Sequence, residues 1–303
     1  MQCCGMVSWG RVRCDMVGCG MIGYDKAGCD RTEEELKVTY LNHSGFLLKW
    51  ETCCWVFDYY KGEIPKLDPT KEIFVFVSHS HRDHFNPAVF ALAAVYPKVT
   101  YIFSNEVKQG CRKLVKASGK VQLSQKQMFK VCGGGIASKT IHMVPIPEVQ
   151  FLRSRTHMEL HDQQGNPLNI FGLQSTDCGC AFLIGYQGKI IYHAGDLHWW
   201  YWSGETESFN KKMTADFKKE MKYLAGQEID LAFSPLDPRQ GSDYALGMNY
   251  LLQQAKVKHV FPMHCWNDYS VCGRYQKEYQ LPQHTTFYPI EKDGQSWELD
   301  SWS

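Results

Sequence analysis

The first half of the chain alternates short apolar runs with polar turns. The runs that are rich in β-branched and aromatic residues and are bounded by Gly, Pro or polar positions are "LKVTYLNHSGFLLKW", "CCWVFDYY" and "EIFVFVSHS". Such runs predict β-strands. Apolar residues at helical spacing follow in "NPAVFALAAVY" and "NEVKQGCRKLVKAS". Asn86 can cap the first predicted helix, and Ser104 or Asn105 can cap the second. This half therefore begins as sheet and then mixes sheet with helix.

The second half repeats the arrangement. Strands are predicted at "PLNIFGLQS", "GCAFLIGYQ", "KIIYHAG", "IDLAFSPLD" and "KHVFPMH". Helices are predicted around residues 207–224 and 243–256. Two halves of mixed sheet and helix indicate an α/β (α+β) fold in which sheets pack together and helices lie outside. No linker or low-complexity tract separates the halves, so we expect one domain over residues 36–303.

Residues 1–35 have a different character. They contain five cysteines and six glycines and show no sustained period of 2 or 3.6. They also lack the CxxC spacing of a zinc site. We expect this segment to be a flexible leader outside the fold.

Composition narrows the class of protein. The 303 residues include 33 basic and 32 acidic ones, for a formal charge of +1, which gives no electrostatic reason to expect a nucleic-acid partner. The 13 cysteines are scattered through a long chain, and we interpret them as mostly reduced thiols, typical of the cytoplasm. No apolar stretch approaches the roughly 18 to 20 residues that span a bilayer, so no membrane association is expected.

The segment "SHSHRDHF" gathers His79, His81, Asp83 and His84 just after a predicted strand. Loops at strand ends commonly carry functional residues. Imidazole nitrogens and carboxylate oxygens are ligands that zinc accepts in proteins. The alternative is the polar start of a helix with solvent-exposed histidines, but it does not explain why three histidines and an aspartate lie so close together. We therefore expect a metal site that draws further ligands from elsewhere in the chain.

Two later strand ends offer such ligands. "KIIYHAGDLH" runs from a strand into a Gly-Asp turn at Asp196, and "HVFPMHCW" is an apolar strand that ends at His264. Each signal is weak alone, because turn aspartates and single histidines are often structural. Together with the first cluster they complete a site.

The ordered combination of HxHxDH, GD and "PMH" resembles the metallo-β-lactamase superfamily. "NHSGFLL" followed by "VFDYY" resembles the first strands of its lactonase-like branch. The resemblance covers about residues 37–266 and implies a four-layer αββα sandwich with the site at the edge between two sheets. It assigns His79 and His81 to a first metal site and Asp196 to a bridging position. Asp83, His84 and His264 would hold a second metal.

One ligand of that pattern is missing. The resemblance implies a histidine in a stretch like HSxDxG, but this chain has "QSTDCGC", with Gln174 or Ser175 at the expected place. We expect Asp177 to substitute as an oxygen ligand. The alternatives are that the first site is weak or empty, or that a histidine of "THMELH", His157 or His161, folds in, although a solvated hairpin is the simpler interpretation of that segment.

Further residues are expected to surround the metals or to contact the substrate. His43 is predicted to hydrogen-bond a ligand or, alternatively, to be a structural residue, and Ser175 to lie beside the site. His193 and His198 flank the Gly-Asp turn and are candidates for contact with substrate. Trp199, in "HWWYW", is a candidate wall of the substrate pocket or, alternatively, an anchor of the next helix against the core. Arg239 is able to bind a substrate carboxylate or phosphate, although an ion pair with Asp237 is the more ordinary role.

These residues predict a metal-dependent hydrolase. A metal-bound hydroxide, available at neutral pH, would attack a small-molecule ester, lactone, amide or phosphodiester, with Asp83 as orienting carboxylate or proton acceptor. The expected cofactor is one or two divalent ions, zinc first and manganese or iron as alternatives favoured by carboxylate ligation. The alternative function is a non-catalytic metal-binding or sensing protein with a degenerate first site. The oligomeric state is left open.

Overall fold

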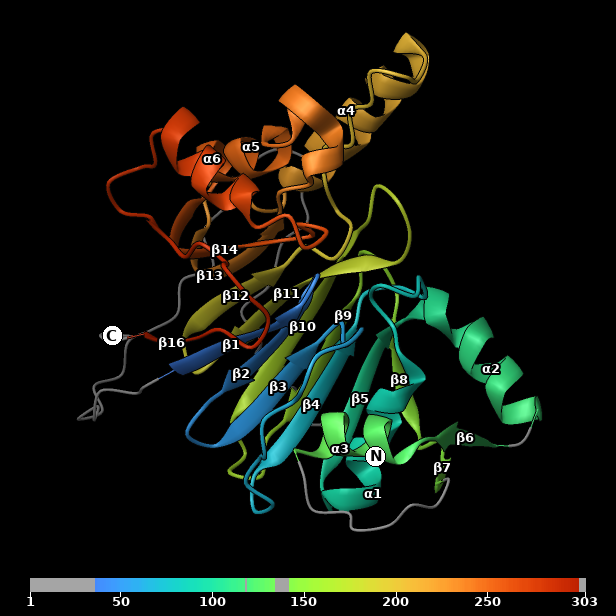
Figure 1. Cartoon of the computed structure of the whole chain (residues 1–303). Helices are drawn as coiled ribbons and strands as arrows, with labels where there is room; N and C mark the ends of the chain where they lie inside the picture. Colours follow the sequence, from blue (N-terminus) through green and yellow to red (C-terminus); the bar gives the residue numbers. More distant parts are fainter. Residues whose placement is uncertain (1–35, 118, 134–141, 300–303) are drawn as a thin grey trace, which may run out of the picture. The chain divides into compact units, whose positions relative to one another are not determined.

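The computed structural model describes residues 36–117, 119–133 and 142–299 (Figure 1). The leader predicted over residues 1–35 lies outside the described residues. Contacts along the chain group residues 31–303 into one compact unit, to which all described residues belong.

Seven strands of the described chain form a first sheet that begins antiparallel and becomes parallel. Its spatial order is β16 (Ser296–Leu299), β1 (Leu36–Asn42), β2 (Gly45–Lys49), β3 (Cys53–Phe57), β4 (Glu72–Val77), β5 (Val99–Ser104) and β8 (Val149–Leu152). The pairs from β3 to β8 are parallel. Strands β1, β2, β3 and β4 are those predicted from the three apolar runs at the start of the fold.

A second sheet of the described residues also has seven strands, and its spatial order runs from β15 to β9. It consists of β15 (Thr286–Phe287), β14 (Lys256–Met263), β13 (Glu228–Pro235), β12 (Lys189–His193), β11 (Cys180–Tyr186), β10 (Pro167–Gln174) and β9 (His157–His161). Strands β12 to β15 are parallel, and β9 to β12 are antiparallel. A separate ribbon pairs β6 (Lys120–Leu123) with β7 (His142–Pro145).

The helices connect and cover these sheets. They are α1 (Leu92–Val95), α2 (Lys108–Ala117), α3 (Gln125–Cys132), α4 (Glu207–Met221), α5 (Leu246–Gln254) and α6 (Ser270–Glu278), with 3₁₀ turns η1 (Pro87–Ala91), η2 (Asn105–Val107) and η3 (Pro238–Asp243). The helices predicted near residues 207–224 and 243–256 are confirmed as α4 and α5. Asn86 accepts from Ala88 at the start of η1, so the predicted cap is also confirmed. Among the described helices, none combines the length and apolarity needed to cross a membrane.

Side chains of β4 alternate between its two faces, and each face packs against a different layer of the fold. Phe74 and Phe76 point into the core between the two sheets, whereas Ile73, Val75 and Val77 pack on the other face. That second face is covered by η1, α1 and α3. Helices α4, α5 and α6 contribute to the core on the outer side of the second sheet (Figure 1). The fold is therefore the predicted four-layer αββα sandwich.

The strand directions bring several loops to one edge of the sandwich. The carboxyl ends of parallel strands lie at the same edge of a sheet, so the loops after β12, β13 and β14 meet there. The antiparallel β10–β11 pair returns its loop, residues 175–179, to this edge. In the first sheet, the β1–β2 turn and the loops after β3 and β4 end at one edge in the same way.

Candidate metal centre

The histidines predicted from distant parts of the chain meet at this edge. His43 occupies the β1–β2 turn, and its carbonyl accepts a hydrogen bond of 3.0 Å from the backbone N–H of His264, which follows β14. His43 and His264 both have left-handed backbone conformations, with φ of 57° and 64°. Such conformations are costly for residues other than glycine and gather at functional sites. The two sheets are therefore joined at the backbone where the candidate ligands lie.

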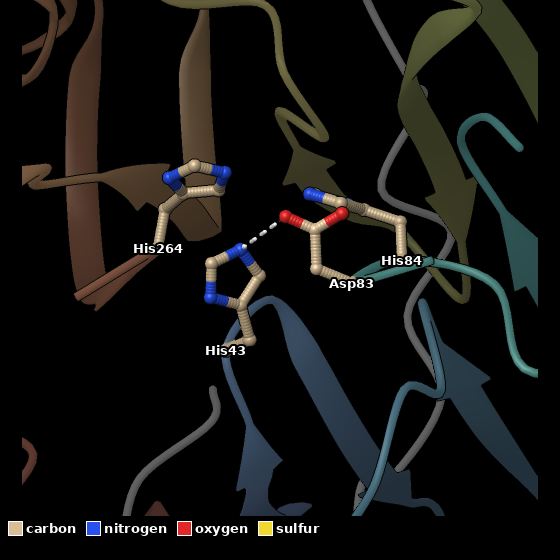
Figure 2. A group of neighbouring side chains, drawn as sticks. All are labelled: His43, Asp83, His84 and His264. Atoms are coloured by element: carbon tan, nitrogen blue, oxygen red, sulfur yellow. Dashed lines mark ion pairs between the residues drawn. The ribbon is translucent and has the colours of Figure 1, made fainter. Parts of the chain in front are cut away.

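A first set of side chains, here called the buried ligand group, consists of His43, Asp83, His84 and His264 (Figure 2). One ligand atom from each lies within 4.8 Å of all the others. Figure 2 shows the four side chains converging from three separate segments, and its dashed line joins His43 Nε2 to Asp83 Oδ2, which lie 3.3 Å apart. Sequence reasoning placed His43 behind a ligand, whereas the structure places it among the atoms able to bind a metal.

A second set, the outer ligand group, consists of His79, His81, Asp177 and Asp196, whose ligand atoms obey the same 4.8 Å limit. His79 and Asp196 are buried, but the side chains of His81 and Asp177 are 50% and 43% exposed. Asp177 Oδ2 lies 3.4 Å from His81 Nδ1. The structure thus places the Asp177 carboxylate near enough to His79, His81 and Asp196 to share an ion with them, and its role as the substitute ligand stays a prediction.

Asp196 faces both groups. Its Oδ2 lies 3.4 Å from His79 Nε2, while its Oδ1 lies 3.1 Å from His84 Nε2 and 3.4 Å from His264 Nε2. A carboxylate in this position is able to bridge two ions, as the sequence predicted.

The donor set also fits a metal because some of its atoms are unsatisfied. The buried atoms His43 Nε2, His84 Nε2 and Asp196 Oδ1 make no hydrogen bond of acceptable geometry with the described residues. Buried polar atoms without partners are rare in folded proteins, and a bound ion is one established explanation. Two to four nitrogen and oxygen atoms per site match the ligands of zinc and of harder divalent ions.

Two fully buried aspartates hold the histidines of the buried ligand group from behind. Asp58 accepts hydrogen bonds from the Ser78 N–H (2.7 Å) and the Ser78 hydroxyl (2.6 Å) and contacts His84 Nδ1 at 2.8 Å. Asp237 contacts His264 Nδ1 at 2.9 Å. Such carboxylates fix the ring orientation and tautomer of metal-binding histidines and raise their basicity. Asp58 was missed as a functional residue, although it directly follows the predicted strand of "VFDYY".

The charges in the centre hold its acids ionised. Burial alone would raise the pKa of Asp196, but His84, His264 and His79 outweigh it and hold that pKa well below its ordinary value. Burial alone would lower the pKa of His84, but Asp196 and Asp58 hold it well above its ordinary value. Burial and the neighbouring His84 lower the pKa of His79 to about 4. A neutral His79 is ready to act as a ligand, whereas His84 must first lose a proton.

The β10–β11 loop explains how an aspartate reaches the outer ligand group. The hydroxyl of the buried Ser175 accepts a hydrogen bond of 3.1 Å from the Asp177 N–H. Gly179 has φ of 72° and abuts the backbone of Ser78, so any side chain there would collide. Ser175 therefore shapes the loop, and Asp177 provides the group that faces His81.

The Gly-Asp turn is braced by His193. This ring is fully buried and stacks on Phe57 at 4.7 Å. Its Nδ1 accepts from the Gly195 N–H at 3.2 Å, and its Nε2 lies 2.9 Å from the Ser44 carbonyl. His193 thus positions the turns that carry Asp196 and His43, and burial keeps it from substrate.

Trp199 packs against α4, which agrees with the alternative that it anchors the next helix and not with a place in the pocket wall. Its Nε1 donates to Thr214 on α4, and Lys218 lies 4.4 Å above its ring. Residues alternate direction in this segment, so Trp200 is the one that contacts His264, at a ring distance of 5.4 Å. His198 is buried against Gln240.

The remaining predicted residues, Arg239, His157 and His161, lie outside both ligand groups. Arg239 forms the ion pair with Asp237 that the sequence favoured. His157 and His161 lie on β9, at the outer strand of the second sheet, and neither belongs to a ligand group of the described residues. The interpretation of that segment as a solvated hairpin is therefore the one that the structure supports.

Comparison with known proteins decides the family. A family model described as the Beta-lactamase superfamily domain matches residues 37–209. The chain belongs to the metallo-β-lactamase superfamily. This agrees with the resemblance carried by HxHxDH, GD and "PMH", and with the αββα layers.

The chain is also similar to individual members. It is 28% identical to a UPF0173 metal-dependent hydrolase of Heliobacterium modesticaldum over 238 residues, 76% of this chain and 82% of the relative. A relative with the same description from Pelotomaculum thermopropionicum is 24% identical over 235 residues, 76% of this chain and 84% of the relative.

Two solved structures share the fold. The metallo-β-lactamase fold protein YhfI of Bacillus subtilis aligns with a TM-score of 0.53 at 13% identity, covering 88% of this chain and 100% of that one. Igni18, a metallo hydrolase of Ignicoccus hospitalis, aligns with a TM-score of 0.52 at 13% identity, covering 88% and 99%. Family, fold and relatives place the chain among the metal-dependent hydrolases of the metallo-β-lactamase fold.

Proposed function

We propose that the protein hydrolyses a small-molecule ester, lactone, amide or phosphodiester with one or two divalent ions held by the buried and outer ligand groups. The observation that carries this proposal is the position of Asp196, whose two oxygens face both groups while one of them is buried without a hydrogen bond. A divalent ion held there supplies Lewis acidity and lowers the pKa of a bound water. Zinc is the first candidate, and manganese and iron are the alternatives.

Asp83 is the proposed proton acceptor. Burial alone would raise the pKa of its carboxyl group, but contact with His43 and the charge of His84 hold that pKa well below its ordinary value. The carboxylate is therefore ionised at neutral pH, as both an orienting group and a proton acceptor for an attacking water must be. Burial lowers the pKa of His43 to about 4, so its ring is neutral beside Asp83.

Aromatic side chains flank the proposed reaction site. Trp266 lies 5.6 Å from the His264 ring and is 41% exposed, and the buried Trp200 packs on the same ring. Apolar walls that exclude water strengthen electrostatic interactions with a bound substrate. They support a small organic substrate. The sequence-based prediction of a lactonase-like branch remains a prediction.

The proposal includes a cytoplasmic location. The described cysteines are free thiols, and those of the core are buried. This is the cysteine usage that a reducing compartment permits.

The test is hydrolysis by the purified protein of four substrate panels: aryl esters, lactones, amides and phosphodiesters. Hydrolysis of at least one panel should disappear with a chelator and return with zinc or manganese. Asp83→Asn should lower kcat by about 100-fold or more, as loss of a general base does. Asp216→Asn, at an exposed position on α4, is the control and should keep full activity. Metal-loaded protein that hydrolyses none of the four panels would contradict the proposal and favour the alternative metal-binding or sensing function.

A further inference from the structure

A cavity of about 380 Å³ lies beside the metal centre. Its lining residues are Trp202, Ser203, Gly204, Glu205, Arg239 and Gln240. Its volume falls in the range of small-molecule sites. Two contacts connect it to the ligand groups: Asp237 binds both Arg239 and His264, and Trp202 stacks at 5.8 Å on Trp200, which packs on His264.

Arg239 is held rigidly at this cavity. Its Nε donates to both carboxylate oxygens of Asp237, at 2.9 and 3.0 Å, and its Nη2 donates to Oδ2 at 2.5 Å. The guanidinium lies 4.2 Å from the Trp266 ring and 5.6 Å from the Trp202 ring, both within cation–π range. The side chain nevertheless remains 46% exposed. Arg239 is thus fixed before any ligand arrives, which reduces the entropy lost on binding.

One edge of the guanidinium is unused. Nη1 makes no hydrogen bond with any residue that the structure describes, because the two contacts with Asp237 use Nε and Nη2. Neutralising Asp237 requires only those two nitrogens. The cavity that Arg239 lines also carries Ser203 and one opposing charge, the exposed Glu205. Arginine with a free edge is the side chain best suited to bind carboxylate or phosphate oxygens.

We propose that this cavity binds an anionic group of the substrate, a carboxylate or a phosphate, through Arg239 Nη1, while the scissile bond lies at the ligand groups. The inference rests on the proposed hydrolase function and narrows its substrates to those that carry a negative charge beside the reacting bond. The Trp202 ring offers a flat surface for an aromatic or apolar portion next to that charge. Arg239 would then determine specificity, in addition to its ion pair with Asp237.

The test compares two probes of nearly equal shape, phenylacetate and neutral phenylacetamide, by calorimetric titration of the full-length, metal-loaded protein. The wild type should bind phenylacetate about tenfold more tightly, the effect of one charge-assisted hydrogen bond. Arg239→Lys keeps a positive charge for Asp237 but has no second arm for the cavity. It should reduce the preference to below about threefold and leave phenylacetamide binding unchanged.

Two further variants test the assignment. Arg274→Lys is the matched control, because Arg274 also pairs with a carboxylate, Glu278, and stacks at 4.2 Å on Tyr244, but does not line the cavity. It should keep the full preference for phenylacetate. Glu205→Gln removes the opposing charge and should tighten phenylacetate binding.

The outcomes separate this inference from the proposed function. An unchanged preference in Arg239→Lys, or equal weakening of both probes, would overturn the anion site and leave Arg239 a purely structural partner of Asp237. Hydrolysis of neutral 4-nitrophenyl acetate, measured on the same protein and abolished by His264→Ala, reports on the hydrolase function alone. An Arg239-dependent preference without hydrolysis of any of the four substrate panels would uphold the anion site and contradict the hydrolase.

Discussion

The two ligand groups differ in how firmly the fold holds them. In the buried ligand group, His84 and His264 are each oriented by a fully buried carboxylate, Asp58 and Asp237. In the outer ligand group, His81 and Asp177 are about half exposed and contact each other. Only His79 of that group has a buried neighbour comparable to these, the Ser78 hydroxyl at 3.0 Å.

This difference predicts two unequal metal sites. Ligands that are fixed before binding lose less entropy when a metal arrives, and their supporting carboxylates raise ligand basicity. The buried ligand group should therefore hold its ion tightly. The outer ligand group should exchange its ion more readily, because two of its side chains must be ordered and Asp177 replaces an imidazole.

The largest effect should follow loss of a buried ligand. His264→Ala removes a nitrogen from the buried ligand group and leaves Asp237 without its imidazole partner. We expect the affinity of the tighter site to fall by more than about 100-fold, beyond the effect of losing a supporting residue. Competition with a chromogenic chelator measures this. His161→Ala, which removes an exposed histidine of β9, should leave both sites intact.

Loss of a supporting carboxylate should have the next largest effect. Asp58→Asn weakens the hold on His84 and Ser78, so the affinity of the tighter site should fall by about 10- to 100-fold. The free energy of unfolding should fall by about 3 kcal/mol, because the partners of a buried charge lose their compensation.

Asp162→Asn is the matched control for Asp58→Asn. Asp162 is also a buried aspartate, which accepts from Tyr186 and Asn166 far from either ligand group. It should lose stability without losing metal affinity. Equal loss of metal in both variants would mean that Asp58 acts only through global stability.

A smaller effect is expected in the outer ligand group. Asp177→Ala should weaken the looser site by about tenfold and leave the tighter site unchanged, because Asp177 supplies one exposed oxygen. Asp216→Ala on α4 serves as the control. Full retention of both ions in Asp177→Ala would show that Asp177 is not the substitute ligand.

The smallest effect concerns pH. Asp196 and Asp58 raise the pKa of His84, so protonated His84 stabilises the metal-free fold most fully below the ordinary histidine pKa of about 6.5. That stabilisation is lost as pH rises through the raised pKa. Metal binding instead requires neutral His84. The gain in Tm on adding zinc should therefore increase from about pH 6 to about pH 8, and a gain that is constant or shrinks would contradict this assignment.

Much of the fold could be predicted from the sequence, because the apolar runs in the sequence are also the segments that are buried in the structure. Strands such as β4, β13 and β14 are buried along most of their length and carry a run of apolar residues before a Pro or polar residue, so their existence was predicted correctly. Helices α3 and α6 and strands β5, β6, β7, β8, β15 and β16 were not predicted. Strands β15 and β16 have only two and four residues, and β16 pairs with β1 at the other end of the chain, so neither gives a local signal.

Only part of the candidate site could be predicted from the sequence. His79, His81, Asp83, His84, Asp196 and His264 were found because they are dense or follow strongly apolar strands. The roles of Asp58 and Asp237 depend on which histidine nitrogen faces a carboxylate, and that is decided by packing of distant segments. The sequence also could not predict which way Trp199 points, because the adjacent Trp199 and Trp200 face in different directions, toward α4 and toward His264.

The most direct test of two unequal sites is metal content per chain, measured by elemental analysis before and after dialysis against a weak chelator. We predict two ions in protein purified without added chelator, and one ion after dialysis. The remaining ion should be absent from His264→Ala and present in Asp177→Ala. Loss of both ions in one step, or binding of none after reconstitution with zinc or manganese, would contradict the account.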